Sequence, residues 1–352
     1  MSSPKEQNQS FQVVIDALLD EQTPFPVQHL RRFSDLPARD LRELMAVWPK
    51  VNLERRRRLL EDLEEISEID MLVAFYDIAK ATLQDSDAQV RMLSVRLLWE
   101  DDDPGLIPTF IGMMEKDPDT QVRATAANAL GFYVYEGEVE NIAVDLLQTV
   151  EDSLLRATQP DQPTSLRQRA LESLGFSSRP EVPDLIQAAY GEDTPDWKAS
   201  ALFAMGRSAD KSWSETVLDQ LDHPNSQVRL EAVRAAGELE LTSSRSELIQ
   251  IAQNDEDEDV RMAAIWSLSQ IGGEEVRELL EKISDEMEND EDIDFLEDAL
   301  DNLSFTEDMA LYDLFEIDVD DIAGEAAEED DANEADHQKP KRKSHKKRGA
   351  ND

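Results

Sequence analysis

The stretch "DPDTQVRATAANALG" (117–131) brings carboxylates, an arginine and a glycine close together, a combination that could bind an anion or move a proton. The same Asp and Arg, four residues apart, return along the chain. A catalytic centre needs one copy of its residues, so this repetition predicts a structural unit and not an active site. The copies are Asp87/Arg91, Asp119/Arg123, Asp257/Arg261 and the variant Asn225/Arg229.

Other catalytic and metal chemistry lacks its usual residues. The chain has no cysteine, which excludes disulfides, thiolate metal sites and thiol nucleophiles. It has no Gly-x-Ser-x-Gly element and no glycine-rich phosphate loop. The acidic stretches "NDEDEDV" (254–260) and "EIDVDDIAGE" (316–325) lack the glycine and spacing of a calcium-binding loop, so we expect solvated loops there. We expect no enzyme activity, no cofactor and no metal site.

Two basic stretches could bind phosphate groups. "LERRRRLLEDL" (53–63) has the pattern of a helix in which Arg57/Glu61 and Arg58/Asp62 are i,i+4 neighbours, so we expect internal ion pairs there. "KPKRKSHKKR" (339–348) would attract any polyanion, including nucleic acid, ribosome, lipid and the acidic segment just before it, but without interleaved aromatic residues it implies no reading of bases. The polyanion-binding candidates are Lys339, Lys341, Arg342, Lys343, Lys346, Lys347 and Arg348.

The formal net charge of −44 is unevenly distributed. Residues 284–336 carry −24 and the last 16 residues carry +6, which leaves −26 on residues 1–283. A field of this sign repels nucleic acid and anionic membranes and attracts basic partners, most strongly at low salt. No apolar run approaches the roughly 18 residues that span a bilayer, and the polar start lacks a signal-peptide pattern. We therefore predict a cytoplasmic protein with a basic protein partner and no membrane contact.

A step of the Val-Arg type recurs along the chain at intervals of 32, 44, 31, 31 and 32 residues. In every copy a small residue follows four positions later and an apolar residue eight positions later. Positions 0, 4, 5, 7 and 8 lie on one side of a helix, and the small residue allows a neighbouring helix to approach closely. Self-similarity of this period predicts a solenoid. The copies begin at Val90, Val122, Leu166, Trp197, Val228 and Val260.

Each copy is predicted to be the second helix of a pair, and apolar spacing places first helices at 104–114, 183–190, 215–221, 246–252 and 275–283. The 44-residue interval hides an insertion with a long first helix over 139–156. Gly131, Gly175, Gly206 and Gly237 are predicted to be left-handed caps that stop the second helices. Less regular helices are expected at 11–19, 39–48, 53–66 and 71–83, and a degenerate unit after Asp292.

These patterns divide the chain into five segments. They are an N-terminal segment with one helix (1–29), an α-solenoid (30–303), a capping helix or docking motif (304–317), an acidic disordered linker (318–336) and a basic tail (337–352).

The repeated pattern D-x-x-x-V-R-x-x-A-x-x-A-L-G resembles HEAT repeats, in the bacterial form often labelled PBS-lyase HEAT-like. "RALESLGFSSRPEV", "SALFAMGRSAD" and "WSLSQIGG" are similar to a Chloroflexi-like group of bacterial HEAT-repeat proteins with no assigned activity. The resemblance implies an all-α, right-handed superhelix of helix pairs, joined by a ladder of hydrogen bonds and ion pairs from the repeated Asp and Arg. A di-iron hydroxylase with HEAT-like repeats carries His-Glu pairs, whereas none of His29, His223, His337 and His345 is followed by Glu.

The face opposite the packing positions is the predicted binding surface. If the second helices line the inner curve, as the resemblance implies, positions 3, 6 and 10 of each copy point into a groove. These positions carry four Arg and four Glu, so the stripe is neutral on an acidic chain. Aromatic and Arg side chains on an open surface are typical of binding hot spots, and aromatic residues tucked between helices are the other interpretation. The partner-binding candidates are Arg96, Asn128, Arg169, Phe203, Arg207, Arg234 and Trp266.

We therefore predict a non-enzymatic scaffold or adaptor that binds a basic protein on its concave or acidic surface. Two alternatives stay open: an enzyme subunit of the lyase-like, chromophore-chaperone type, and a nucleic-acid- or ribosome-associated protein that acts through the basic tail. A neutral inner stripe argues against a glycosylase-like use of the solenoid, which needs a basic inner surface.

Overall fold

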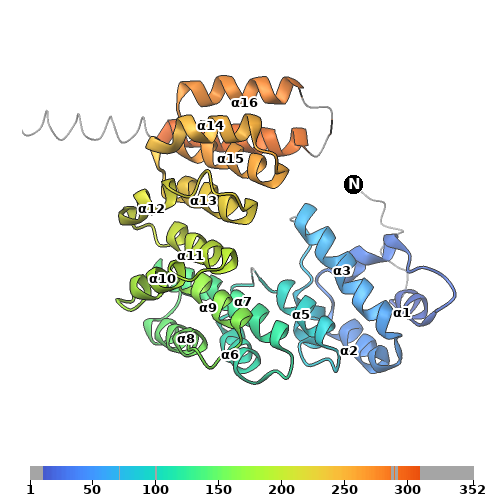
Figure 1. The fold of residues 1–352 in the computed structure, drawn as a ribbon. Helices are drawn as coiled ribbons and strands as arrows, with labels where there is room; N and C mark the ends of the chain where they lie inside the picture. The colour runs from blue at the N-terminus through green and yellow to red at the C-terminus, as the bar shows by residue number, and fades with distance from the viewer. Residues whose placement is uncertain (1–10, 71, 100, 287–288, 290–291, 310–352) are drawn as a thin grey trace, which may run out of the picture. The chain divides into compact units, whose positions relative to one another are not determined.

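The computed structural model describes residues 11–309 apart from 71, 100, 287–288 and 290–291. The described residues form α-helices and short 3-10 helices and contain no β-strand (Figure 1). They belong to two compact units, Met1–Ala264 and Ile265–Asp352, whose boundary falls inside helix α15.

The first unit is a stack of helix pairs, as predicted. The N-terminal helices are α1 (Gln12–Leu19), the 3-10 helix η2 (Val27–Phe33), α2 (Ala38–Val47) and α3 (Leu53–Ile69). The pairs that follow are α4 (Tyr76–Thr82) with α5 (Ala88–Arg96), α6 (Ile107–Lys116) with α7 (Thr120–Glu138), α8 (Val144–Ala157) with α9 (Thr164–Leu174), α10 (Val182–Tyr190) with α11 (Pro195–Arg207) and α12 (Ser214–Leu218) with α13 (Ser226–Glu238). Helix α14 (Arg245–Asn254) precedes α15 (Glu258–Ile271).

The second helices pack on one another in chain order, from α3 through α5, α7, α9 and α11 to α13. The repeated positions of the second helices, including those of α15, are buried in all six copies. Position 0 is Val90, Val122, Leu166, Trp197, Val228 or Val260; position 4 is Ser94, Ala126, Ala170, Ala201, Ala232 or Ala264; position 8 is Leu98, Leu130, Leu174, Met205, Ala236 or Leu268. Burial of these side chains supplies the main driving force for stacking, since a single pair cannot cover its apolar face alone.

The glycines at the ends of the apolar stripes do not stop the helices, contrary to our prediction. Gly131, Gly206 and Gly237 lie inside α7, α11 and α13, and Gly175 caps α9 with an ordinary right-handed φ of −52°. These glycines instead allow a neighbouring helix to pack close to the backbone. A Cβ at Gly175 would lie 2.9 Å from the Cα of Ala204 on α11, which is closer than packed carbon atoms come.

Non-glycine residues end three of these helices. Glu140, Ala209 and Glu240 have φ of 63°, 51° and 51°, in the left-handed region that favours glycine. Each follows the capping residue of α7, α11 or α13. After α13, the Glu240 N–H donates to the Gly237 carbonyl (2.8 Å) and the Leu241 N–H to the Ala236 carbonyl (2.9 Å), which is the Schellman pattern.

A ladder of Arg–Asp contacts joins neighbouring pairs, with partners other than the Asp four residues earlier. That earlier residue caps its own helix: Asp119 accepts from the Val122 N–H (3.2 Å). Arg91 instead binds Asp117 of the next pair with two hydrogen bonds (2.8 and 2.7 Å), and Arg229 binds Asp255 in the same way. The insertion after α7 interrupts the ladder, because Arg123 donates to the Met114 carbonyl and to Gln162.

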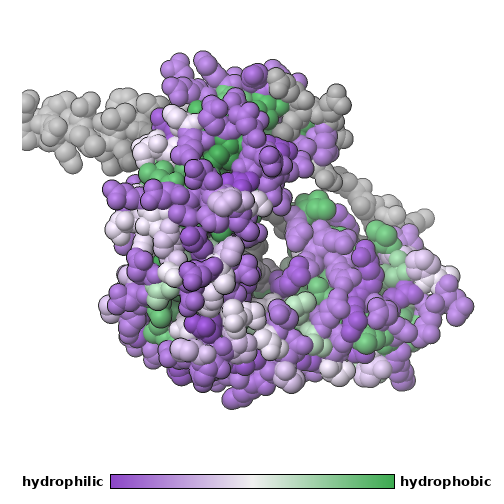
Figure 2. Space-filling view, viewed as in Figure 1, coloured by the Kyte–Doolittle hydropathy of each residue, from purple (hydrophilic) through white to green (hydrophobic). Residues whose placement is uncertain are grey.

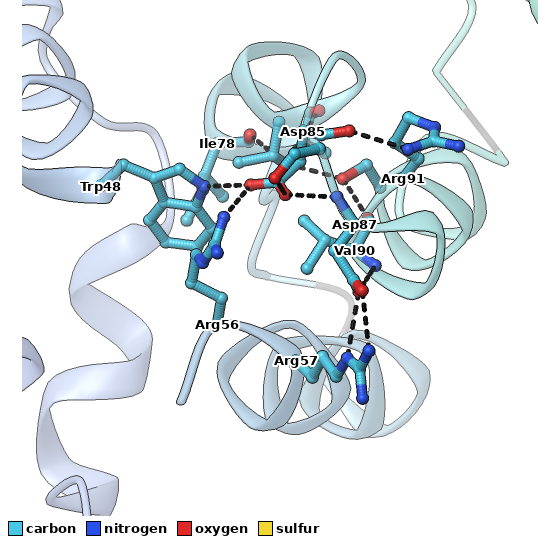
Figure 3. Close-up of polar contacts among 12 residues, drawn as sticks. Trp48, Arg56, Arg57, Ile78, Asp85, Asp87, Val90 and Arg91 are labelled. Carbon is cyan, nitrogen blue, oxygen red and sulfur yellow. Dashed lines mark hydrogen bonds and ion pairs between the residues drawn. The ribbon is translucent and has the colours of Figure 1, made fainter. Parts of the chain in front are cut away.

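Two of the four consecutive arginines of α3, Arg56 and Arg57, serve the same ladder, and Arg57 does so in place of the predicted pair with Glu61. Arg56 Nη1 and Trp48 Nε1 donate to one oxygen of Asp85 (2.6 and 2.7 Å), and Arg57 makes two hydrogen bonds to Asp87 (3.0 and 2.7 Å; Figure 3). Arg55 donates to the carbonyls of Asp20 and Thr23. Arg58 pairs with Asp62 (2.7 Å), as its i,i+4 spacing predicts.

The second unit contains the rest of α15, α16 (Glu274–Glu286) and a helix over 292–309. Leu296, Ala299 and Leu303 of the predicted degenerate unit are buried. Arg277 binds Glu307 (2.6 Å) and Asn302 donates to Ser269 (2.9 Å), so the last described helix is fixed by polar contacts too. The helix passes the predicted domain boundary at 304. The remainder of that segment, the acidic linker and the basic tail lie outside the described residues.

Candidate functional site

Three predicted partner-binding residues line one cavity in the first unit. Arg96 of α5, Asn128 of α7 and Arg169 of α9 lie on successive second helices and face a space of about 820 Å³. The end of α3 and the connection from α3 to α4 complete its wall. Figure 2 shows the surface hollowed between α3 and the stack of α7, α9 and α11. The stripe that we predicted from the repeat therefore forms a concave site over three consecutive helices.

Most charges of this cavity are neutralised within the protein. Arg96 forms an ion pair with Glu64 of α3 (2.5 Å), and Arg169 forms one with Glu172 of its own helix. Desolvation raises the pKa of Glu64, and the Arg96 guanidinium opposes this shift. Glu68, which also lines the cavity, has no ion pair among the described residues, and Asn128 makes no hydrogen bond within them. A carboxylate and a primary amide are thus available to a ligand.

An exposed aromatic residue, Trp99, lines the same cavity and was missed by the sequence prediction. Its side chain is 42% exposed. The repeat pattern predicts the groove positions of this copy at 93, 96 and 100. Helix α5 ends at Arg96, however, and the turns that follow bring Trp99 to the surface while Leu93 is buried. Leu72, in the α3–α4 connection beside the cavity-lining Val73, is 91% exposed.

The next part of the face is a cluster of aromatic rings around Arg207. The Arg207 guanidinium lies over the rings of both Phe176 (4.5 Å) and Phe203 (4.1 Å), and one of its N–H groups donates to the Glu172 carbonyl (3.3 Å). Tyr135 packs against Phe176 at 5.3 Å. Each cation–π contact stabilises this arrangement by about 0.5–2 kcal/mol. Phe203 is half-buried under the arginine, so only part of this predicted hot-spot residue is open to a partner.

Glu172, Glu231 and Glu238 occupy three further predicted positions. Glu172 is buried and accepts from Ser200 Oγ (2.7 Å), while Glu231 is buried and pairs with the exposed Arg234 (3.2 Å). Desolvation is the main cause that raises the pKa of Glu231 and brings the pKa of Glu238 to about 7. Leu93, Ser200 and Glu231 are buried. Position 3 of these copies therefore belongs to the interface between second helices and not to an open groove.

A family model of HEAT repeats matches residues 77–159 and 214–301. The helix pairs within these two ranges are HEAT repeats. The matched ranges contain α4 to α8 and α12 to α16, including the Val-Arg copies at Val90, Val122, Val228 and Val260. No curated protein matches the chain by sequence.

Several solved structures resemble the chain at low identity and with TM-scores below 0.5. The complex of CpcE and CpcF of phycocyanin lyase from Nostoc sp. PCC7120 has a TM-score of 0.43 and 19% identity, over 65% of this chain and 94% of that chain. YibA of Escherichia coli has a TM-score of 0.41 and 14% identity, over 81% and 98%. Importin β has a TM-score of 0.41 and 12% identity, over 85% and 47%. At this level the likeness concerns the fold alone.

The remaining predicted residues belong to the second unit or lie outside the described residues. Trp266 belongs to the second unit, where it packs against Phe295 at 6.1 Å and keeps 38% of its surface exposed. The basic candidates of the tail lie in the undescribed part of the chain. Within the described ranges, no group of three or more His, Asp or Glu side chains is arranged to hold a metal ion, and no helix has the length and apolar character of a membrane span.

Proposed function

We propose that this HEAT-repeat protein is a non-enzymatic cytoplasmic scaffold that binds a basic partner protein at the cavity lined by Arg96, Trp99, Asn128 and Arg169. The observation that carries the proposal is the meeting of an exposed tryptophan, an unbonded amide and an unpaired carboxylate, Glu68, in one concave site.

The size and shape of the cavity suit a few side chains of a partner. A space of about 820 Å³ lies in the range of ligand sites, roughly 300–1,000 Å³. Its wall comes from α3, α5, α7 and α9 together, so a bound segment would contact several repeats at once. Contact with several repeats is how solenoids use an extended surface.

Each free group in the cavity has a complementary group on a protein. Trp99 offers apolar area that would be covered by an aliphatic or aromatic side chain, and tryptophan is among the residues that dominate interface energies. The Asn128 amide both donates and accepts, so it matches a peptide group. Glu68 favours a cationic side chain, and the charge of −26 on residues 1–283 steers a basic partner towards the unit.

The test is affinity capture from native lysate with the wild-type chain and with Trp99→Ala/Asn128→Ala. We expect the double variant to lose the captured partner while its circular dichroism and thermal unfolding stay unchanged, since both side chains are partly exposed. Phe305→Ala is the matched control, because it removes an exposed aromatic residue from the second unit. Equal capture by all three proteins would show that the cavity is not the binding site.

Phe203→Ala, suggested by the repeat pattern, is expected to weaken capture as well, whereas Trp266→Ala changes the second unit and should leave capture at the cavity unchanged. Phe203→Ala also removes the ring beneath Arg207, so its unfolding free energy must be measured together with its binding.

A further inference from the structure

Two aliphatic side chains at the end of α3 are open to water at the border of the cavity. Ile69, the last residue of α3, is 86% exposed, and Leu72, in the connection to α4, is 91% exposed. They are the most exposed large apolar side chains among the described residues. Their chain neighbours Glu68 and Val73 line the cavity. We call Ile69 and Leu72 the apolar ridge, and Figure 2 shows hydrophobic surface at this end of α3.

The connection that carries Leu72 is held by hydrogen bonds, so the exposure of the ridge is built into the fold. The Leu72 N–H donates to Asp70 Oδ1 (3.0 Å), and Asp70 forms an ion pair with Arg31 of η2 (2.5 Å). Two residues further on, the Ala74 N–H donates to Ser34 Oγ (3.1 Å). A partner would therefore meet the apolar side chains already in place, which lowers the ordering cost of binding.

The ridge continues an apolar part of the cavity wall. Val73, Leu97 and Trp99 line the cavity, and Trp99 keeps 42% of its surface exposed. Single exposed aliphatic side chains are common on protein surfaces, but a group of them beside a concave site is typical of an interaction surface. A ligand that covered Ile69 and Leu72 would remove most of their side-chain surface from water, and such burial is the main driving force of association.

The border of the ridge is acidic, which decides the charge of the occupant. Residues 61–70 contain six carboxylates and no Lys or Arg. Within the part of the chain that the structure describes, three arginines form ion pairs with five of these carboxylates, namely Arg31, Arg58 and Arg96. Six carboxylates against three arginines leave a charge of −3, and the carboxylate without an ion pair is Glu68. It lies in the last turn of α3, where the helix dipole disfavours negative charge and favours a cation.

A helix suits this surface better than an extended segment does. The described residues form no strand, so they offer no sheet edge to which an extended segment could add by backbone hydrogen bonds. A helix satisfies most of its own backbone groups, and its apolar face presents side chains at positions i, i+3, i+4 and i+7. The Asn128 amide can pair with one of the backbone groups that a helix leaves free at its ends.

We therefore propose that the partner binds through a basic amphipathic helix. Its apolar face covers Ile69 and Leu72 and reaches Trp99 in the cavity, while a lysine or arginine side chain lies next to Glu68. This inference rests on the proposed function and adds to it the form of the bound segment and an anchor at the border of the cavity.

The ridge can be tested with the full-length chain and a fluorescent peptide of about 14 leucine and lysine residues, with the leucines on one helical face. We expect the wild type to bind this peptide at least about tenfold more tightly than a scrambled peptide of the same composition, measured by fluorescence anisotropy. Ile69→Ser/Leu72→Ser should lower the affinity by about tenfold or more, because two buried aliphatic side chains are lost from the interface.

The matched control for the ridge is Val27→Ser/Val144→Ser. It removes two other exposed aliphatic side chains from the first unit and should keep the wild-type affinity. Circular dichroism and thermal unfolding of both double variants should match the wild type, since all four replaced side chains are exposed.

The charge of the bound helix has a test of its own. Glu68→Gln and Glu215→Gln each remove one exposed carboxylate, so they change the net charge of the chain equally. Only Glu68→Gln should weaken binding of the leucine–lysine peptide, by about two- to fivefold at low salt. Equal affinities of the two variants would overturn the contact between Glu68 and a cation of the helix.

The ridge does not bind the helix if Ile69→Ser/Leu72→Ser has the same affinity as the control double variant, or if the scrambled peptide binds as tightly as the ordered one. The occupant is a second copy of this chain if sedimentation shows wild-type dimers that the two serine substitutions dissociate, and that result overturns the proposal. Partner capture separates the ridge from the proposed function. Loss in Trp99→Ala/Asn128→Ala with normal capture in Ile69→Ser/Leu72→Ser overturns the ridge alone, and the reverse result overturns the cavity as the binding site.

Discussion

Replacing Arg229 by Met is expected to lower the free energy of unfolding by about 2–4 kcal/mol. Arg229 makes two hydrogen bonds to Asp255, at 2.8 and 2.7 Å, and a third to the His223 carbonyl at 2.9 Å. Only 15% of the arginine side chain and 7% of the aspartate side chain are exposed. Methionine keeps the aliphatic volume but leaves the Asp255 carboxylate shielded from water with one backbone donor, the Asp257 N–H.

Arg58→Met is the matched control for this prediction. Arg58 pairs with Asp62 at 2.7 Å, but its side chain is 61% exposed. The same substitution should therefore lower the free energy of unfolding by less than about 0.5 kcal/mol. Urea unfolding followed by far-ultraviolet circular dichroism measures both variants. The double variant Arg229→Met/Asp255→Asn should recover part of the loss, because the unpaired charge is gone. If Arg229→Met lowers the free energy of unfolding no more than Arg58→Met does, the Arg–Asp ladder does not stabilise the packing of neighbouring repeats.

Three further outcomes follow from the helix ends and the ladder. Ala209→Gly should raise the unfolding free energy by about 1 kcal/mol, measured by urea unfolding, because glycine adopts the left-handed conformation at that position without steric cost. Gly175→Ala should lower it by about 1–3 kcal/mol, since its Cβ would meet the backbone of Ala204, and an unchanged melting temperature would contradict the close approach. In an acid titration, the stability difference between wild type and Arg229→Met should be fully present above pH 3.8 and should shrink as the pH falls from 3.8 through the lowered folded-state pKa of Asp255. The hydrogen bonds from Arg229 hold the pKa of Asp255 below 3.8 in the folded state, so the contribution of the pair is lost as the carboxylate protonates.

The repeats themselves could be predicted from the sequence because they provide internal copies. Six helices place a small residue at the same position, and in the structure all six are buried against a neighbouring helix. A single copy would not distinguish a packing stripe from an active-site motif. The agreement among copies did so, since any residue needed for chemistry would appear once.

The role of the glycines could not be predicted, for a physical reason. A glycine after an apolar stripe has the same sequence signature whether it caps the helix or admits a close neighbour. The distinguishing quantity is the distance from its Cα to the next helix, and that distance depends on residues about 30 positions away, such as Ala204 for Gly175. The partners of the arginines were missed for the same reason, because Arg91 reaches past the capping Asp87 to Asp117 of the following repeat.

The contacts of the Arg and Glu residues in the neutral stripe decide which charges it presents to a partner. Arg96 is paired with Glu64, Arg169 with Glu172 and Arg234 with Glu231, and these pairs offer little net charge to a partner. Arg207 is stacked between two rings. Among the described residues, the carboxylates of Glu68 in the cavity and of Glu238 near Arg207 form no ion pair. The charge that a surface presents is the charge left after internal pairing, and here that remainder has the same sign as the chain. A basic partner thus meets complementary charge both at long range and at contact.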